Sequence, residues 1–449
     1  MKNFKRSIAA LAVATTLGMA TPVFADNSAG SIYGVAQAGQ TISIKSLQTG
    51  AKRNVTIDSD GRFSFKQLPT GKYEVTNGSE TYTITVAIGT GTNVQFVGDN
   101  VERISVQGAR ISAIDTSSVE ASTVFTQDQI QMLPVSRDLT SVALLAPGTT
   151  KGDSGFGNLA SFGGSSVAEN GYYINGFDVT NLRTMISFAD LPFDAIGQQQ
   201  VKTGGYGAEY GRSLGGVINI VTKRGGNDFN FGGAVYTSPA ALRSNTKDVK
   251  TVDPEREGEY TVYGSENEYS TMSYNAWASG ALIEDTLFLY GMVEGQNNQY
   301  DDYNKQESDV YKDTDPQYML KLDWQINDDH LLEFTHIQNE QTRDYTTYSN
   351  TNDELYTGKH GDQQSTYGLI NGGAINILKY TGYITDDLTV SVLWGNSENL
   401  ISVTTPSTID PAAAECPRVF DSRDGGITQI GCWNSAQTTI PDPAVGPDT

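Results

Sequence analysis

The residue types that metal and nucleophilic chemistry require are sparse in this sequence of 449 residues. It contains three histidines, His330, His336 and His360, and none of them stands at metal-ligand spacing to a cysteine. Neither a His-Glu-x-x-His motif nor a Walker loop occurs, and the basic run from Lys223 to Gly226 lacks the pattern of a phosphate loop. We therefore expect no catalytic residue, no metal site and no cofactor, and we expect the protein not to be an enzyme.

Acidic side chains are the other groups that chemistry can use. Asp58 and Asp60 belong to an Asp-x-Asp-Gly sequence, but an EF-hand counted from Asp58 requires a glycine and a carboxylate where Phe63 and Pro69 stand. We therefore interpret this segment as the turn of a β-hairpin. Four further aspartates, which could bind calcium or remain solvated, occur in later polar segments: Asp301, Asp302, Asp313 and Asp315.

The charge balance limits the partners. The sequence has 30 lysines and arginines against 52 aspartates and glutamates, which gives a formal net charge of −22. Such a chain would repel a nucleic acid rather than attract it. We therefore expect no nucleic-acid partner.

The first residues have the pattern of a secretory signal peptide. The start is cationic, residues 8–19 form an apolar core that is too short to span a bilayer, and residues 23–25 offer a small-residue cleavage site. We expect a Sec-type signal peptide over residues 1–25.

The two cysteines, Cys416 and Cys432, stand in the last Pro- and Asp-rich segment. In an exported chain this favours one disulfide that closes a loop, which in the chain-entropy model would stabilise the fold by about 3 kcal/mol. A metal site is the alternative.

Glycine is dense from Ser166 to Asn227. Runs such as Gly204-Gly205 permit tight turns and close backbone approach, and residues 217–221 form a short apolar strand. These features suit a compact domain held inside a narrow tube, and an ordinary glycine-rich soluble domain is the alternative. The ordered combination ENGYYINGFDVTN, AEYGRSLGG and VTKRGGN closely resembles the plug domain of TonB-dependent outer-membrane receptors, especially the Oar-like (OmpA-related) branch. The resemblance places the plug at residues 111–227.

Residues 26–98 alternate apolar and polar positions between turn signals, as in the run from Tyr82 to Val86. We predict a small all-β sandwich here. The segments 58–65 and 68–73 resemble the carboxypeptidase regulatory-like domain that often precedes Oar-type plugs.

Residues 99–110 connect the predicted sandwich to the plug. They contain a short alternating run that resembles a TonB box, the segment that receptors offer to the energy-transducing protein TonB. The interaction would be strand addition, in which an extended peptide pairs with an exposed sheet edge. The expected TonB-binding residues are Glu102, Arg103, Ile104, Ser105, Val106 and Gln107.

The sequence after Asn227 alternates in longer segments, which is typical of membrane β-barrel strands. In the clearest segment, the even-numbered residues from Tyr318 to Ile326 would face lipid, and the odd-numbered residues from Met319 to Gln325 would face the lumen. Seven strands are predicted, near residues 228–238, 270–283, 286–298, 316–326, 330–345, 368–384 and 387–403. Short turns alternate with long polar loops, near residues 239–269, 299–315 and 346–367.

The predicted fold class is therefore mainly β: a small β-sandwich, an α+β plug domain, and the first strands of a transmembrane antiparallel β-barrel over residues 228–449. Receptors of this kind close their barrels with about 22 strands. We therefore expect the sequence to be the N-terminal portion of a longer receptor.

The resemblance implies a function in the outer membrane of a Gram-negative bacterium. The receptor would take up a scarce siderophore, peptide or carbohydrate while the proton-motive force rearranges its plug. Its partners would be TonB with the inner-membrane energising complex, outer-membrane lipid and an unknown ligand. The alternative is an Oar-like surface protein for adhesion or protein secretion.

The resemblance also assigns roles to plug residues. Glu209 and Arg212, within AEYGRSLGG, would help to seat the plug against the barrel. The substrate would bind at the plug apex, through Tyr172, Tyr173, Asn175 and Phe177.

Overall fold

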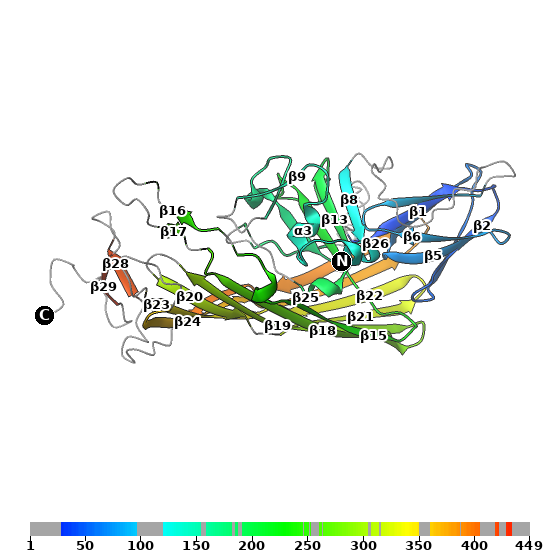
Figure 1. The fold of residues 1–449 in the computed structure, drawn as a ribbon. Helices are drawn as coiled ribbons and strands as arrows, with labels where there is room; N and C mark the ends of the chain where they lie inside the picture. The colour runs from blue at the N-terminus through cyan, green and yellow to red at the C-terminus, as the bar shows by residue number, and fades with distance from the viewer. Residues whose placement is uncertain are drawn as a thin grey trace, which may run out of the picture.

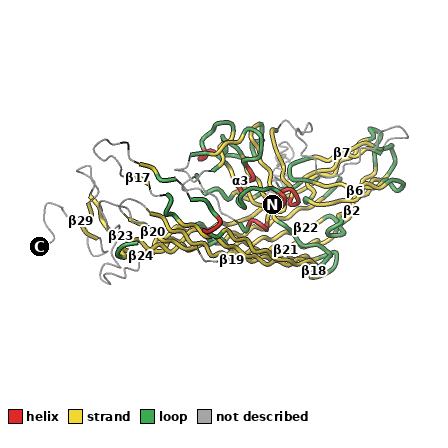
Figure 2. The backbone as a smooth tube through the Cα atoms, in the orientation of Figure 1, coloured by secondary structure: helices red, strands yellow, loops and turns green. Residues whose placement is uncertain are grey.

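The structure is a computed structural model that consists mainly of β-strands (Figure 2). It describes residues 28–96, 120–153, 159–181, 185–186, 191–245, 247–250, 252, 260–262, 264–303, 307–313, 316–349, 360–386, 388–404, 418–421 and 428–432. Within these ranges, no α-helix is long and apolar enough to cross a bilayer.

The first unit is a β-sandwich, drawn in blue in Figure 1. One sheet has the strand order β4-β1-β7 and the other β3-β2-β5-β6. Alternate residues of each strand point inward, so side chains such as Ile32, Ile44, Phe65 and Val75 form a common core. The strands are β1 (Gly30–Val35), β2 (Thr41–Ser46), β3 (Lys52–Thr56), β4 (Arg62–Leu68), β5 (Gly71–Thr76), β6 (Thr81–Val86) and β7 (Gly91–Gln95).

The segment at Asp58 and Asp60 is a turn, in which the Gly61 N–H donates to the Asp58 carbonyl oxygen at 3.1 Å. It connects β3 to β4, and these strands belong to different sheets. The predicted hairpin is therefore wrong, although the predicted turn is present. Turn residues specify a chain reversal, whereas the sheet that the next strand joins depends on distant pairing partners.

The second unit, the plug, has a five-stranded sheet with the order β12-β11-β14-β13-β8 and two short helices. The Asp138 side chain caps the second helix by accepting from the Ser141 N–H at 2.7 Å. The strands and helices are β8 (Ala121–Thr126), α2 (Gln127–Met132), α3 (Leu139–Ala143), β9 (Thr149–Lys151), β10 (Ala160–Phe162), β11 (Gly171–Ile174), β12 (Phe177–Asp178), β13 (Ile196–Gly204) and β14 (Val217–Thr222). Every residue of β14 is buried, because this strand lies in the middle of the sheet.

The third unit is one large, open antiparallel sheet, which we call the barrel wall. The plug lies against one face of the wall, and the sandwich lies at the end of the wall where the short turns are (Figure 1). The wall strands are β15 (Asn230–Ser238), β18 (Glu268–Ile283), β19 (Leu287–Tyr303), β20 (Glu307–Asp313), β21 (Gln317–Asn327), β22 (His330–Gln338), β23 (Gln341–Ser349), β24 (Gln363–Gly372), β25 (Ala374–Tyr383), β26 (Thr389–Ser397) and β27 (Leu400–Thr404).

Seven long segments cross the wall, because β20 continues into β21, β22 into β23, β24 into β25, and β26 into β27. The seven predicted strands and their alternating faces are therefore confirmed. In β21, Met319, Lys321 and Asp323 are at most 3% exposed against the plug, whereas Tyr318 and Trp324 are 44% and 46% exposed on the outer face.

Two of the predicted loops are shorter than expected. Much of residues 299–315 and 346–367 belongs to paired strands, since β20 pairs with both β19 and β23, and β24 pairs with β23. These extensions are polar and rich in tyrosine, so their sequence has too little apolar contrast to be recognised as strand.

Two small hairpins lie apart from the three units. They are formed by β16 (Val249–Lys250) with β17 (Tyr260–Val262), and by β28 (Arg418–Asp421) with β29 (Thr428–Cys432). Both lie toward the end of the wall opposite the sandwich (Figure 1).

Candidate functional site at the interface of plug and barrel wall

The tip of a tight hairpin in the plug contacts the barrel wall. Asn175 and Gly176 connect β11 to β12 with φ angles of 50° and 86°, which is the geometry of a type I′ turn. The Asn175 side-chain amide donates to Thr222 Oγ1 of the plug at 3.0 Å and to Thr335 Oγ1 of the wall at 3.1 Å. Its Oδ1 accepts from the Thr222 N–H at 3.0 Å. This asparagine therefore connects two plug strands to strand β22 of the wall.

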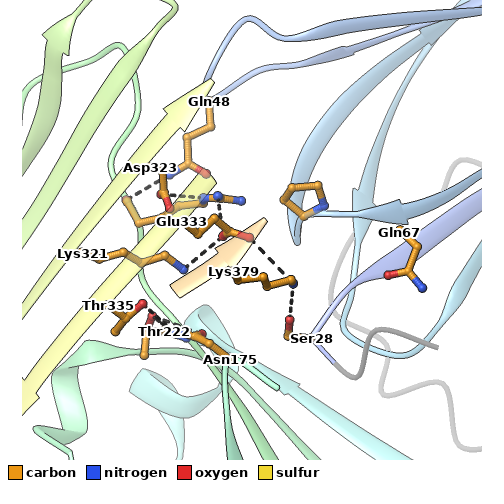
Figure 3. A network of polar contacts seen from close by, with 12 residues as sticks. Ser28, Gln48, Gln67, Asn175, Thr222, Lys321, Asp323, Glu333, Thr335 and Lys379 are labelled. Carbon is orange, nitrogen blue, oxygen red and sulfur yellow. Dashed lines mark hydrogen bonds and ion pairs between the residues drawn. The ribbon is translucent and has the colours of Figure 1, made fainter. Parts of the chain in front are cut away.

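Arg224 lies just after β14, where the chain leaves the plug (Figure 3 shows the surrounding polar network). Its Nε is 3.1 Å from Asp323 Oδ2, and its Nη2 is 2.9 Å from Glu333 Oε1. Burial alone would lower the pKa of Arg224, but the attraction of Asp323 and Glu333 offsets this effect and raises it. The guanidinium is therefore held as a cation by two carboxylates of the wall.

Two lysines of the wall complete the charged cluster. Lys321 Nζ is 3.5 Å from Glu333 Oε1, and Lys379 Nζ is 3.7 Å from Glu333 Oε2. Three cations thus face two carboxylates, and all five side chains are largely buried. Removing either carboxylate would leave buried cations without a partner in a poorly hydrated place, which is costly. Below, these residues are called the charged cluster: Arg224, Lys321, Asp323, Glu333 and Lys379.

An apolar contact lies on the same wall strands, farther from the turns. Met319, Ile337, Ile375 and Ile377 are at most 1% exposed and belong to one hydrophobic core with the plug strands. The strands β21, β22 and β25 therefore change along their plug-facing side from apolar residues to charged ones as they approach the turns.

Two glycines allow the plug and wall to approach closely. A Cβ at Gly225 would lie 2.5 Å from the Leu289 carbonyl oxygen of the wall, and a Cβ at Gly395 would lie 2.8 Å from the ring of Phe177. Both distances are too short for real side chains, so glycine is required on each side of the interface.

The four residues predicted to bind substrate are buried or half-buried. Asn175 and Phe177 contact the wall, Tyr172 belongs to the core that plug and wall share, and Tyr173 packs within the plug. Tyr172, Tyr173 and Asn175 are 1%, 5% and 6% exposed, and Phe177 is half-buried against Gly395. Burial raises the pKa of Tyr172, whose hydroxyl accepts from Asn170 Nδ2 at 3.4 Å. In this arrangement, a ligand would reach these side chains only after the plug moves, and their role in substrate binding stays a prediction.

Glu209 and Arg212 lie near an aromatic cluster of the plug. The ring of Tyr210 packs edge-on against Tyr173 and Tyr206, with centroids 5.3 and 6.0 Å apart. Burial, with a smaller contribution from Asp178, raises the pKa of Tyr173 to about 12. Glu209 and Arg212 also act on that hydroxyl electrostatically. Their seating role stays a prediction. Among the described residues, the ion pairs that join the plug to the wall involve Arg224.

Residues 211–215 read Gly-Arg-Ser-Leu-Gly and so match the Gly-x-Ser-x-Gly pattern of a nucleophile elbow. The structure does not support that chemistry. Ser213 is 8% exposed in a loop, and its hydroxyl lies 2.9 Å from the Gly216 carbonyl oxygen and 3.0 Å from the Tyr206 hydroxyl. The motif lacks the strand-to-helix context of an elbow, and Ser213 is a structural residue of the loop.

Several expectations fall partly or wholly outside the described residues. The predicted TonB box, Glu102 to Gln107, lies there, as do Cys416 and Asp315. The disulfide and the TonB contact therefore stay predictions. Among the residues that the structure describes, no group of three His, Cys, Asp or Glu side chains is placed to hold a metal ion. Asp313 instead binds Arg343 through two contacts of 2.6 and 2.9 Å.

A row of tyrosines crosses the wall beyond the plug. The rings are in direct register on neighbouring strands, with successive centroids 5.6, 4.5, 5.2 and 4.7 Å apart. By alternation, they share the face of Asn275, Met319 and Ile337, which is the face that contacts the plug. The tyrosine row consists of Tyr269, Tyr300, Tyr311, Tyr345 and Tyr367.

A domain held against one face of a β-sheet whose other face is apolar has the arrangement of a plugged outer-membrane barrel. Comparison with known proteins agrees with this class. The family of the TonB-dependent receptor plug domain matches residues 115–217. The chain is 26% identical over 352 residues to the TonB-dependent transporter Oar of Myxococcus xanthus. The resemblance of this chain to TonB-dependent receptors, and to the Oar-like branch among them, is therefore confirmed.

The match to Oar covers 66% of this chain and 31% of Oar, so the chain spans about a third of the length of that relative. Among solved structures, the siderophore receptor PirA from Acinetobacter baumannii has a TM-score of 0.40 at 17% identity, over 64% of this chain and 41% of PirA. The ferric enterobactin receptor PfeA from Pseudomonas aeruginosa has a TM-score of 0.37 at 19% identity, over 58% and 38% of the two chains. The matched family is that of a receptor domain and Oar is a transporter, which agrees with the expectation that the protein is not an enzyme.

Proposed function

We propose that the protein to which this chain belongs is an outer-membrane transporter that admits a scarce siderophore, peptide or carbohydrate when TonB, driven by the proton-motive force, rearranges the plug. The observation that carries this proposal is the charged cluster. It joins the plug exit to the wall through ion pairs and hydrogen bonds rather than through apolar packing. Polar contacts of this kind can be exchanged for water as the plug moves, whereas exposed apolar surface cannot be compensated in that way.

The tyrosine row is the surface that this chain offers to an incoming substrate. Its rings stack on one another, so their faces are largely covered and a ligand would meet the row through ring edges and hydroxyls. The Tyr269 hydroxyl already donates to Asp302 Oδ1. Such a surface suits an oxygen-rich ligand that exchanges hydrogen bonds, such as a carbohydrate or a siderophore. Replacing Tyr311 with phenylalanine should weaken binding of that ligand while the stacking persists. Unchanged affinity in this variant would exclude the hydroxyl from the binding surface.

Deletion of residues 102–107 tests the TonB-driven mechanism. Cells that express the receptor without this segment should lose uptake of radiolabelled ferric siderophores, peptides or oligosaccharides, whichever the intact receptor transports. Ligand binding to the cell surface should persist, because the tyrosine row is intact. Uptake that continues after the deletion would contradict the TonB-driven mechanism.

We also propose a second candidate function, an Oar-like surface protein whose acidic, tyrosine-rich segments mediate adhesion or protein secretion. Cells that lack the protein would then lose attachment or secretion while growth on scarce iron, sugars or peptides stays normal. The uptake proposal predicts the opposite pattern. Either role requires export, and cell fractionation with N-terminal sequencing should find the protein in the outer membrane with residues 1–25 removed.

A further inference from the structure

The N-terminal sandwich is docked onto the plug. The Ile88 N–H donates to Gln198 Oε1 at 2.8 Å, and Gln200 Nε2 donates to the Ile88 carbonyl oxygen at 3.4 Å. Ile88 and Gln200 are both 0% exposed. The two glutamines belong to β13, which pairs with both β8 and β14 inside the plug sheet. The sandwich therefore holds an inner strand of the plug.

The sandwich is also docked onto the turn end of the barrel wall. The Tyr383 hydroxyl donates to the Gln67 carbonyl oxygen at 2.7 Å, and the guanidinium of Arg53 lies 3.8 Å from the centre of the Tyr383 ring. The Lys52 N–H donates to Asp328 Oδ1 at 3.1 Å. Gln67 has a φ of 59°, a left-handed conformation that residues other than glycine, asparagine and aspartate rarely adopt. The strained residue thus stands at the docking contact itself.

A third set of contacts joins the sandwich to the charged cluster. Lys379 Nζ lies 2.6 Å from Ser28 Oγ, and Gln48 Nε2 donates to the Arg224 carbonyl oxygen at 3.3 Å. Figure 3 shows Ser28 and Gln48 approaching the cluster from the sandwich side. The same charged groups therefore contact all three units.

This three-way junction is polar and has room for water. A cavity of about 40 Å³ is lined by residues of all three units, including Arg53, Tyr73, Arg224 and Asp323. Arg53 Nη1 and Asp323 Oδ1 are buried without a hydrogen-bond partner among the described residues. A water molecule needs only about 10–15 Å³ of such volume, so the cavity has room for water. Interfaces that are polar and hydrated separate more readily than large apolar ones.

We propose that the sandwich is a releasable latch, which holds β13 and the plug exit against the barrel wall at rest and undocks before the plug moves. This inference rests on the proposed plug rearrangement. The chain between β7 and β8 connects the latch directly to the edge strand of the plug. A force on that connection would therefore act both on the contacts of the sandwich and on the plug.

Hydrogen–deuterium exchange of the purified receptor tests the latch without TonB or substrate. The probe is the peptide that contains the Ile88 amide, which is protected only while the sandwich is docked. Tyr383→Phe removes the hydroxyl that bonds to Gln67 and keeps the ring beneath Arg53. Loss of one such hydrogen bond should speed exchange at Ile88 by about fivefold.

Tyr380→Phe is the matched control, because it removes a hydroxyl from the same strand, β25, whose partner is His330 of the wall at 2.7 Å. The control should exchange at the rate of the parent protein. Equal rates in the parent and in Tyr383→Phe, or equal acceleration in both variants, would overturn the latch.

Conductance in planar bilayers in potassium chloride provides the second readout. Channels of the Tyr383→Phe and Gln198→Ala variants should open more often than those of the parent protein.

Gln199→Ala is a further control, because it loses a bond to the Leu139 carbonyl within the plug and leaves the sandwich contacts in place. It should therefore leave exchange at Ile88 unchanged. If Tyr383→Phe speeds exchange at Ile88 but the channel does not open more often, the sandwich does not hold the plug and the latch is overturned. Failure of TonB-driven uptake, by contrast, would leave both readouts as predicted and would count against the proposed function alone.

Discussion

The plug meets the barrel wall through two contacts that differ in kind. Far from the turns, the wall presents Met319, Ile337 and Ile375 to the plug core. Near the turns, the same strands present Lys321, Glu333 and Lys379. The apolar half gains free energy from burial regardless of exact geometry, whereas the charged half is favourable only while its carboxylates face the buried cations. The difference indicates that the apolar half holds the plug. The charged half fixes the position of the plug, and its contacts can be exchanged for water when the plug moves.

Loss of the central carboxylate should have the largest effect. Glu333→Gln leaves Arg224, Lys321 and Lys379 without their shared partner, and breaking a buried ion pair costs about 3–5 kcal/mol. Urea unfolding of the receptor in detergent micelles measures the change. Glu284→Gln, in an exposed turn of the wall, is the control and should be silent. Equal stability of the two variants would mean that the cluster is not a unit.

Loss of the hairpin contact should have a smaller effect. Asn175→Ala leaves the buried Thr222 N–H and the Thr335 hydroxyl without their partner, at a cost of about 1–3 kcal/mol. The same unfolding measurement applies. Asn230→Ala removes only a local bond at the surface, to the Asp228 carbonyl at 3.1 Å, and serves for comparison. If the two variants are equally stable, the tip of the hairpin does not anchor the plug.

A single methyl group in the apolar half should matter less again. Ile337→Val should lower the free energy of unfolding by about 0.5–1.5 kcal/mol, because it leaves a small cavity between plug and wall. Ile326→Val changes the outer face, where the side chain is 45% exposed, and should cost less. A larger loss for Ile326→Val would reverse the assignment of the two faces.

Alkaline pH should lower the free energy of unfolding through Tyr73, a sandwich residue beside the charged cluster. Near neutral pH, this residue should have no such effect. Burial raises the pKa of Tyr73, beside Arg224, from 10.0 to about 12. The unfolded chain therefore loses this proton first, and stability falls as the pH rises from 10 to 12. Below pH 10 the contribution is constant. The free energies of unfolding of the parent protein and of Tyr73→Phe should converge as the pH rises over this range. A difference that stays constant with pH would contradict the raised pKa.

The sequence predicts the faces of the wall strands well, because each strand alternates between apolar and polar residues. In β21, Lys321 and Asp323 were expected on the inner face and are found there. The basic run at Lys223 and Arg224 lacks the pattern of a phosphate loop, and in the structure Arg224 pairs with Asp323 of the wall instead. The partners of Arg224 lie 99 and 109 residues away in the chain, so no local pattern could identify them.

Two features escaped prediction for physical reasons. The tyrosine row depends on the register between neighbouring strands, which a single sequence does not state. Docking of the sandwich depends on Gln198 and Gln200, whose polarity within β13 is the only local signal of a partner. Gln198 and Gln200 lie on the same side of a buried strand, and two such amides could have suggested an interface.

The most direct test of the account is to lock the plug at the charged half. Cysteines at positions 175 and 335, in a receptor whose Cys416 and Cys432 are replaced by serine, would join the plug hairpin to β22. Conductance in potassium chloride is then recorded in planar bilayers under mild urea, before and after reduction of the cross-link. The account predicts a channel that stays closed when oxidised and opens when reduced. A channel that opens equally in both states would show that the plug need not leave this interface, which would contradict the central claim.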